Sequence, residues 1–150
     1  MTRINLAIPV ENLTDEHLRA EHREIKRICH NFAVRYSNNS MKNLPNNFCL
    51  GTGHVLFFIN KPTLTLNRYL SLYKECIKRN FNVQNYSDNW NIYNGHFDYS
   101  KEPKFEVNDN HIQMIVERIV SNINTGKQQN YHYYGERISK QKAIDIIRQS

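Results

Sequence analysis

The stretch that decides the fold is LTDEHLRAEHREIKR, which runs from Leu13 to Arg27. Thr14 is a good helix N-cap, because its side-chain oxygen can accept a backbone N–H of the first turn. Asp15 and Glu16 place negative charge beside the positive end of the helix dipole. Apolar residues then recur at helical spacing, at Leu18, Ile25, Ile28, Cys29, Phe32 and Tyr36. The pattern predicts one long helix over residues 14–37.

Two more helices follow further along the chain. Pro62 is well suited to the first turn of the second helix, and Asn80 can take the left-handed position that ends it. Asn108 or Asp109 caps the third helix, which Gly126 ends. Both segments carry apolar residues at helical spacing, so each is expected to bury one face.

The remaining segments are connections. Residues 1–12 are expected to form an extended arm, and residues 82–107 a long polar loop of the kind that often has a function. Periodicity does not separate a short strand from a buried irregular segment over residues 48–59. We therefore expect an all-α fold: a compact single domain, residues 1–150, of three main helices joined by long loops. Residues 139–150 form a C-terminal extension with a short docked helix.

Composition indicates the kind of partner and compartment. A formal net charge of +6 favours a polyanionic partner, of which nucleic acid is the commonest, although a merely solvated basic surface gives the same balance. Three cysteines without close pairing suggest reduced thiols. No stretch resembles a signal peptide or reaches transmembrane length. We expect a cytoplasmic or nuclear protein that is neither secreted nor membrane-bound.

Charged side chains form a row on the first predicted helix. Arg19, Arg23 and Arg27 are spaced four residues apart and lie on one face, with Glu24 next to them. Most such rows are solvated helix faces. A single carboxylate within an arginine cluster is also how an enzyme would hold one base against a phosphate-binding surface.

The first three residues, Met1-Thr2-Arg3, suggest a nucleophile. A small residue at position 2 allows methionine aminopeptidase to remove Met1, which leaves Thr2 with a free α-amino group. Such an amine has a pKa of about 7.7–8.0, so a sizeable neutral fraction is available to form a Schiff base. Many chains begin this way without any such role, so the feature alone decides nothing.

The ordered set of motifs resembles the pyrimidine-dimer DNA glycosylase/AP lyase family, of the phage and algal-virus endonuclease V type. The matching segments are residues 1–6, 13–27, 50–61 and 75–82, and the motif Tyr133-Tyr134-Gly135. The resemblance implies a three-helix monomer without a cofactor that binds ultraviolet-damaged double-stranded DNA containing a cyclobutane pyrimidine dimer.

The resemblance also implies roles for single residues. The Thr2 amine attacks the anomeric carbon of the 5′ nucleotide of the dimer, the glycosidic bond breaks, and a protein–DNA imine forms. β-Elimination then nicks the strand, with Glu24 as the essential carboxylate. The family kinks the DNA and flips out the base opposite the lesion. The implied DNA contacts are Arg3, His17, Arg23, Arg27 and Arg118.

The sequence departs from the family pattern at several positions. Lys26 replaces a proline of the phage members, and Asn122 a basic residue. The aromatic stretch Trp-Tyr-Lys-Tyr-Tyr-Gly reads Asn-Tyr-His-Tyr-Tyr-Gly over residues 130–135. Two alternatives therefore stay open: a non-catalytic DNA-binding protein of the same fold, and a glycosylase for a different damaged base.

Two other patterns are weighed against a ligand. His17 and His22 are five residues apart, which is poor spacing for a shared metal, so no metal site is expected. The run Gly51-Thr52-Gly53-His54 is not followed by the Gly-Lys-Ser/Thr of a phosphate loop. Tight packing is the better explanation of its glycines, and His54 is expected to pack in the core.

Overall fold

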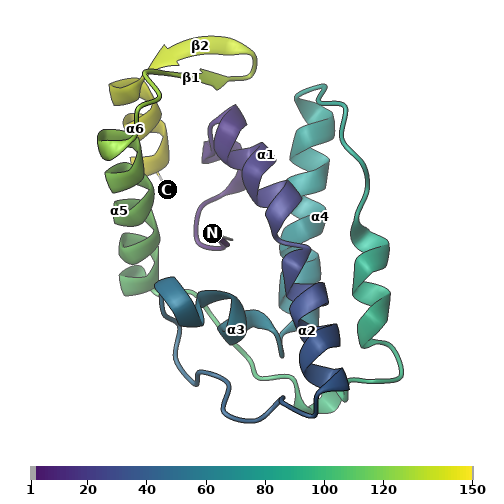
Figure 1. The fold of residues 1–150 in the computed structure, drawn as a ribbon. Coiled ribbons are helices and arrows are strands. Elements are labelled where there is room, and N and C mark those ends of the chain that lie inside the picture. The colour runs from purple at the N-terminus through teal and green to yellow at the C-terminus, as the bar shows by residue number, and fades with distance from the viewer. Residues whose placement is uncertain (1–2, 150) are drawn as a thin grey trace.

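A computed structural model of the chain, which describes residues 3–149, is mostly helical and carries one small antiparallel hairpin (Figure 1). In chain order its elements are η1 (Val10–Asn12), α1 (Asp15–Glu24), α2 (Arg27–Ser37), η2 (Gly51–Gly53), α3 (His54–Phe58), α4 (Pro62–Lys78), η3 (Ser87–Tyr93), η4 (Tyr99–Lys101), α5 (Asp109–Thr125), β1 (Asn130–Tyr133), β2 (Glu136–Ser139) and α6 (Lys140–Arg148). None of the helices in this described part of the chain is both long and apolar enough to cross a membrane.

The predicted helix ends are confirmed at several points. The Thr14 hydroxyl accepts the His17 N–H at 3.2 Å at the start of α1. Asn108 caps α5 by accepting the His111 N–H at 2.9 Å. Asn80, two residues beyond the end of α4, adopts a φ of 62°. Local signals were sufficient here, because a cap depends only on residues within one turn of it.

The first predicted helix is two helices, so a description by three main helices is not confirmed. Between α1 and α2 the backbone tightens at Ile25 and Lys26, where the Ile28 N–H reaches the Ile25 carbonyl at 3.1 Å and the Cys29 N–H reaches the Lys26 carbonyl at 3.0 Å. These are bonds of the 3₁₀ type. Apolar spacing continues through the break, which is why the sequence pattern did not reveal it.

The all-α prediction needs a second correction, because β1 and β2 form a hairpin in which Asn130 pairs with Ser139 and Tyr133 with Glu136. Tyr134 and Gly135 make the two-residue turn with φ values of 51° and 83°. Positive φ at both central positions matches the right-handed twist of a hairpin. The hairpin joins α5 to α6 at one end of the molecule (Figure 1). The ambiguous segment 48–59 contains no strand and folds as η2 and α3.

The N-terminal arm, residues 3–13, runs into the middle of the molecule between α1 and α5 (Figure 1). It is not extended throughout as expected, because it contains η1 and a turn in which the Ile8 N–H donates to the Asn5 carbonyl at 2.8 Å. Ile4, Ile8 and Leu13 are fully buried in the hydrophobic core. The long connection 82–107 also contributes, since Trp90 and Tyr93 are buried and the Trp90 indole N–H donates to Thr65 Oγ1 at 3.0 Å. The expected docked helix of the tail is α6, whose buried face includes Ile144 and Ile147.

Candidate functional site

Two buried arginines of the α4 region hold the N-terminal arm. Arg68 forms two hydrogen bonds with the Glu21 carboxylate, at 2.8 and 2.9 Å, and donates a third to the Ile8 carbonyl at 2.7 Å. Arg79 contacts Asp15 at 2.9 Å and Glu75 at 3.1 Å. These arginines fix the arm against α1, because each one binds a carboxylate and also a backbone carbonyl of the arm, Ile8 for Arg68 and Leu13 for Arg79.

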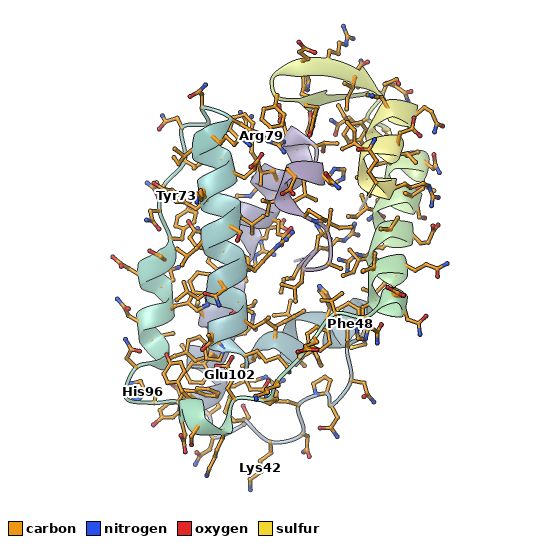
Figure 2. All side chains as sticks on the ribbon, turned by 180° about the vertical axis from the view of Figure 1, so that it is seen from behind. Lys42, Phe48, Tyr73, Arg79, His96 and Glu102 are labelled. Atoms are coloured by element: carbon orange, nitrogen blue, oxygen red, sulfur yellow. The ribbon has the colours of Figure 1, made fainter. Side chains whose placement is uncertain are left out.

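Arg79 also lies under the hairpin (Figure 2). Its guanidinium carbon is 4.3 Å from the centre of the Tyr134 ring, and its Nη1 donates to the Leu13 carbonyl at 2.8 Å. The Asp15 carboxylate accepts the backbone N–H groups of Tyr134 and Gly135 at 3.1 and 2.9 Å. The aromatic segment is therefore fastened to the start of α1, next to the arm.

Three of the predicted DNA-contacting residues lie together beside the arm. Arg118, on α5, donates to Asn5 Oδ1 at 3.0 Å, and its buried Nε has no hydrogen-bond partner in residues 3–149. Burial, followed by the charge of Arg3, lowers the pKa of Arg118 to about 10. Burial lowers the pKa of His17 to about 4, with Glu16 opposing and Arg3 adding to the effect. The charge of Arg3 thus acts on both His17 and Arg118. We call these three residues the cationic corner; its positive charge comes from the two arginines, because the His17 imidazole is neutral near pH 7.

The predicted catalytic carboxylate is the last residue of α1. Glu24 has a side chain that is 20% exposed, and its Oε1 lies 4.0 Å from Nη2 of Arg23, which is 64% exposed. Arg27 is exposed at the start of α2. The other predicted catalytic residue, Thr2, lies outside the described residues.

The break between the helices divides the predicted arginine row between two hollows. The larger has a volume of about 480 Å³ and is lined by Arg19, His22, Arg23, residues 81–84 and Tyr86. Arg19 stacks on the Phe81 ring at 3.8 Å, and Lys26 on the Tyr86 ring at 3.6 Å. The smaller hollow, about 360 Å³, is lined by Lys26, Arg27, Cys29, His30, Ala33, Asn89 and Ile92. On this face, Arg19 and Lys26 therefore each cover one aromatic ring.

The aromatic stretch, residues 130–135, has both buried and exposed side chains. Tyr131 is buried and stacks on His17 with ring centres 5.7 Å apart. The His132 Nδ1 lies 2.6 Å from Glu16, and the Tyr134 hydroxyl donates to Glu75 at 2.5 Å. The stretch is thus linked to the cationic corner through His17.

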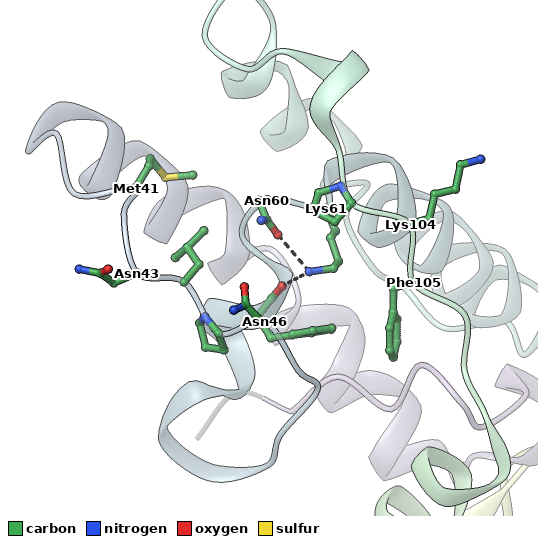
Figure 3. A pocket seen from close by; sticks show the side chains of 11 residues that line it. Met41, Asn43, Asn46, Asn60, Lys61, Lys104 and Phe105 are labelled. Carbon is green, nitrogen blue, oxygen red and sulfur yellow. Dashed lines mark hydrogen bonds between the residues drawn. The ribbon is translucent and has the colours of Figure 1, made fainter.

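A further cavity of about 470 Å³ lies away from all these residues, beside α3 and the start of α4 (Figure 3). Lys61 Nζ donates to the Phe57 carbonyl at 2.6 Å and to Asn60 Oδ1 at 3.0 Å. Burial lowers the pKa of Lys61 to about 8, with Glu102 opposing. Because its ammonium group satisfies the Phe57 carbonyl near the end of α3, and its backbone N–H the Phe58 carbonyl, its role is structural. None of the predicted site residues lines this cavity.

Sequence patterns did not reveal the ion pairs that hold the N-terminal arm in place. Glu21 and Arg68 are 47 residues apart, and Asp15 and Arg79 are 64 apart. Only the tertiary fold brings such pairs together. The described part of the chain holds no group of three or more His, Cys, Asp or Glu side chains able to bind a metal ion, and its three cysteines are free thiols.

Part of the chain matches a known family. A family model described as pyrimidine dimer DNA glycosylase matches residues 1–89. The matched part includes the arm, the α1–α2 junction and the larger hollow, and therefore Arg3, His17, Arg23, Glu24 and Arg27. Arg118 and the hairpin lie beyond it.

Proposed function

Since the chain belongs to the pyrimidine dimer DNA glycosylase family, we propose that it excises cyclobutane pyrimidine dimers from ultraviolet-damaged duplex DNA and then nicks the strand as an AP lyase. The observation that carries this proposal is the family match over the arm and the α1–α2 junction. The cationic corner supports it, because the guanidinium groups of Arg3 and Arg118 suit a phosphate backbone and the neutral His17 imidazole can still form a hydrogen bond.

The proposed nucleophile is the α-amino group of Thr2 after removal of Met1. Its nitrogen attacks the anomeric carbon of the 5′ nucleotide, and the glycosidic bond breaks with the electron pair leaving on the base. Loss of the amine proton and opening of the sugar ring give an imine. Removal of a sugar C2′ proton then expels the 3′ phosphate, which nicks the strand.

The charges around the arm favour a neutral, reactive amine. Arg3 is covalently next to Thr2, and Arg118 is hydrogen-bonded to Asn5 three residues further on. Nearby cations disfavour a second positive charge, which lowers the pKa of an amine, whereas a carboxylate such as Glu24 raises it. The balance keeps an uncharged fraction at neutral pH.

Glu24 takes two roles in this mechanism. Its carboxylate stabilises the positive charge that develops on the sugar as the base leaves. It then accepts the C2′ proton in the elimination step. The Arg23 guanidinium lies 4.0 Å from the carboxylate, and as a 64% exposed side chain it can reach a phosphate of the bound strand.

The larger hollow is the proposed binding pocket for a flipped base. Arg19 and Phe81 offer a stacked pair of planes on one side, and Tyr86 offers a ring on another. Flipped bases are bound by stacking on aromatic rings and guanidinium planes. A pyrimidine dimer weakens local pairing, so extrusion of a base costs less there than in intact duplex.

Borohydride trapping tests the reaction directly. Protein lacking Met1 is expected to form a covalent adduct with dimer-containing duplex and none with undamaged duplex, while protein that retains Met1 forms none. Absence of any adduct with active, Met1-free protein would overturn the proposal. Intact mass establishes which N-terminus is present, and a retained Met1 favours the non-catalytic alternative.

A Glu24→Gln variant tests the carboxylate. It should bind damaged duplex normally but cleave it at least about 100-fold more slowly, because the acid–base group is lost while its shape remains. Glu106→Gln, a change at an exposed carboxylate elsewhere, is the control and should cleave at the wild-type rate. Equal cleavage by Glu24→Gln and wild type would remove Glu24 from the mechanism.

A glycosylase for a different damaged base is the second candidate. The observation that favours it is the aromatic stretch, whose sequence departs from the family pattern. Its Tyr131 is buried against His17 and its Tyr134 hydroxyl donates to Glu75, so these two groups are engaged within the protein. Cleavage of a panel of duplexes, each with one defined lesion, separates the two candidates. Preference for a lesion other than the dimer would establish the second.

A further inference from the structure

We propose that His54 is a positioning residue that fixes the N-terminal arm at Ile4 and thereby sets where the Thr2 amine meets the DNA sugar. This inference rests on the proposed function. It gives a role to a buried histidine that the sequence alone indicated only as core packing.

Two hydrogen bonds define the state of the imidazole. The Ile4 backbone N–H donates to Nε2 at 2.9 Å, and Nδ1 lies 3.0 Å from the Cys49 carbonyl. A carbonyl oxygen only accepts, so Nδ1 must carry the proton and Nε2 must be the acceptor. Both contacts are therefore satisfied by one neutral tautomer.

The surroundings keep His54 in this tautomer and orientation. The ring is 1% exposed, and Phe48 and Phe58 pack edge-on against it with ring centres 5.6 and 5.4 Å away. Burial, followed by the charge of Arg118, lowers its pKa to about 4. At neutral pH the ring therefore stays uncharged and remains an acceptor.

The glycine run before His54 explains how the acceptor reaches the arm. A Cβ on Gly53 would lie 2.8 Å from Cys49 Sγ, so a larger residue there would force the Cys49 side chain to move. Gly51, at the start of η2, has a φ of 79°, which glycine adopts without strain. The two glycines lie in the tight turn between Cys49 and His54, across which the Cys49 carbonyl accepts the Nδ1 proton, and this packing explains a motif that is not a phosphate loop.

Position along the chain makes this contact matter for catalysis. Among residues 3–149, the Ile4–His54 hydrogen bond is the one nearest to the chain start, and Ile4 itself is fully buried. Two residues span at most about 7 Å, so the placement of Ile4 limits the reach of the Thr2 amine. A misplacement of about 1 Å at a reacting atom can cost about 100-fold in rate.

The test compares His54→Leu with His54→Gln. Leucine removes the acceptor, whereas the glutamine side-chain oxygen can reach the position of Nε2. Single-turnover imine formation, trapped with borohydride on a dimer-containing duplex, should fall about 10- to 100-fold for His54→Leu. His54→Gln should recover most of the rate. The Kd for the same duplex should stay within about threefold of wild type in both.

Tyr93→Phe is the matched control for lost stability, because it deletes another buried hydrogen bond, from the Tyr93 hydroxyl to the Ile59 carbonyl. It should leave the imine rate unchanged at temperatures well below unfolding. If His54→Leu does not fold, an ester in place of the Ile4 amide, installed by semisynthesis, removes the donor and leaves His54 in place.

The outcomes separate the two proposals. If wild-type protein forms the adduct and His54→Leu or the Ile4 ester forms it at the same rate, the positioning role alone is overturned. Loss of rate that is matched by Tyr93→Phe, or not recovered by His54→Gln, also overturns it. Absence of an adduct with wild-type protein overturns the proposed function and this inference with it.

Discussion

At the scale of single residues, the buried ion pair between Arg68 and Glu21 has the most consequence. Their side chains are 6% and 1% exposed, and Arg68 also holds the Ile8 carbonyl of the arm. Burying such charges costs free energy, which only complete pairing and hydrogen bonding offset. The pair therefore fixes the arm more than it adds net stability.

Replacing one partner should show this. Arg68→Met leaves the Glu21 carboxylate and the Ile8 carbonyl buried without their donor, so the free energy of unfolding should fall by about 3–5 kcal/mol. Urea denaturation measures the change. The double variant Arg68→Met with Glu21→Gln should lose much less than the sum of the single losses, because no uncompensated charge remains. Strictly additive losses would contradict the pairing.

At the scale of elements, the junction of α1 and α2 sets the site. α1 carries His17, Arg23 and Glu24, and the tightened backbone at Lys26 redirects the chain so that Arg27 faces a different hollow. The Lys26 N–H donates to no backbone carbonyl within the described chain, and its φ of −63° is the value that proline requires. The break is thus built into the backbone at the position where the phage members of the family carry proline.

Lys26→Pro should therefore be tolerated. Proline at a compatible position gains about 0.4–1 kcal/mol, while the helical Ile25 before it and the lost contact with Tyr86 oppose that gain. We expect a net change in the free energy of unfolding within about 1 kcal/mol. Ala20→Pro, inside α1, should cost about 3 kcal/mol or more. Similar large losses for both variants in urea titrations would show that the junction is an ordinary helix interior.

At the scale of the whole molecule, folding encloses histidines in their neutral form. Burial lowers the pKa of both His17 and His54 from 6.5 to about 4. Between pH 6.5 and 4, these two histidines bind protons in the unfolded chain but stay neutral in the folded chain. Their contribution to stability is therefore complete above pH 6.5 and is lost as the pH falls through about 4.

Stability should accordingly fall between pH 6.5 and 4. Because each pKa step corresponds to about 1.4 kcal/mol, His54 alone can account for a loss on the order of 3 kcal/mol. Urea denaturation at several pH values measures the slope. His54→Gln should flatten it, whereas His30→Gln, at an exposed histidine, should leave it unchanged. An unaltered slope in His54→Gln would show that His54 is not held neutral in the fold.

The amino-acid sequence by itself determined the helices with strong local signals and the family, whereas the roles of the candidate site residues stay predictions. Thr14 and Asn108 cap the starts of their helices and Asn80 follows the end of α4, as expected, because caps are formed within one turn. The resemblance carried by residues 13–27 agrees with the family match over residues 1–89. Arg3, His17 and Arg118 lie together, while Thr2 stays a prediction outside the described residues.

Only the tertiary structure decided how the arm is held. The hydrogen bond from Ile4 to His54 spans 50 residues, and the ion pairs of Arg68 and Arg79 span 47 and 64. The hairpin is another tertiary feature, since strands of four residues have little local signal and β1 is fastened to Glu16 of α1. Periodicity reports which face of a segment is buried, but not which distant polar group satisfies it, because that choice depends on the packed whole.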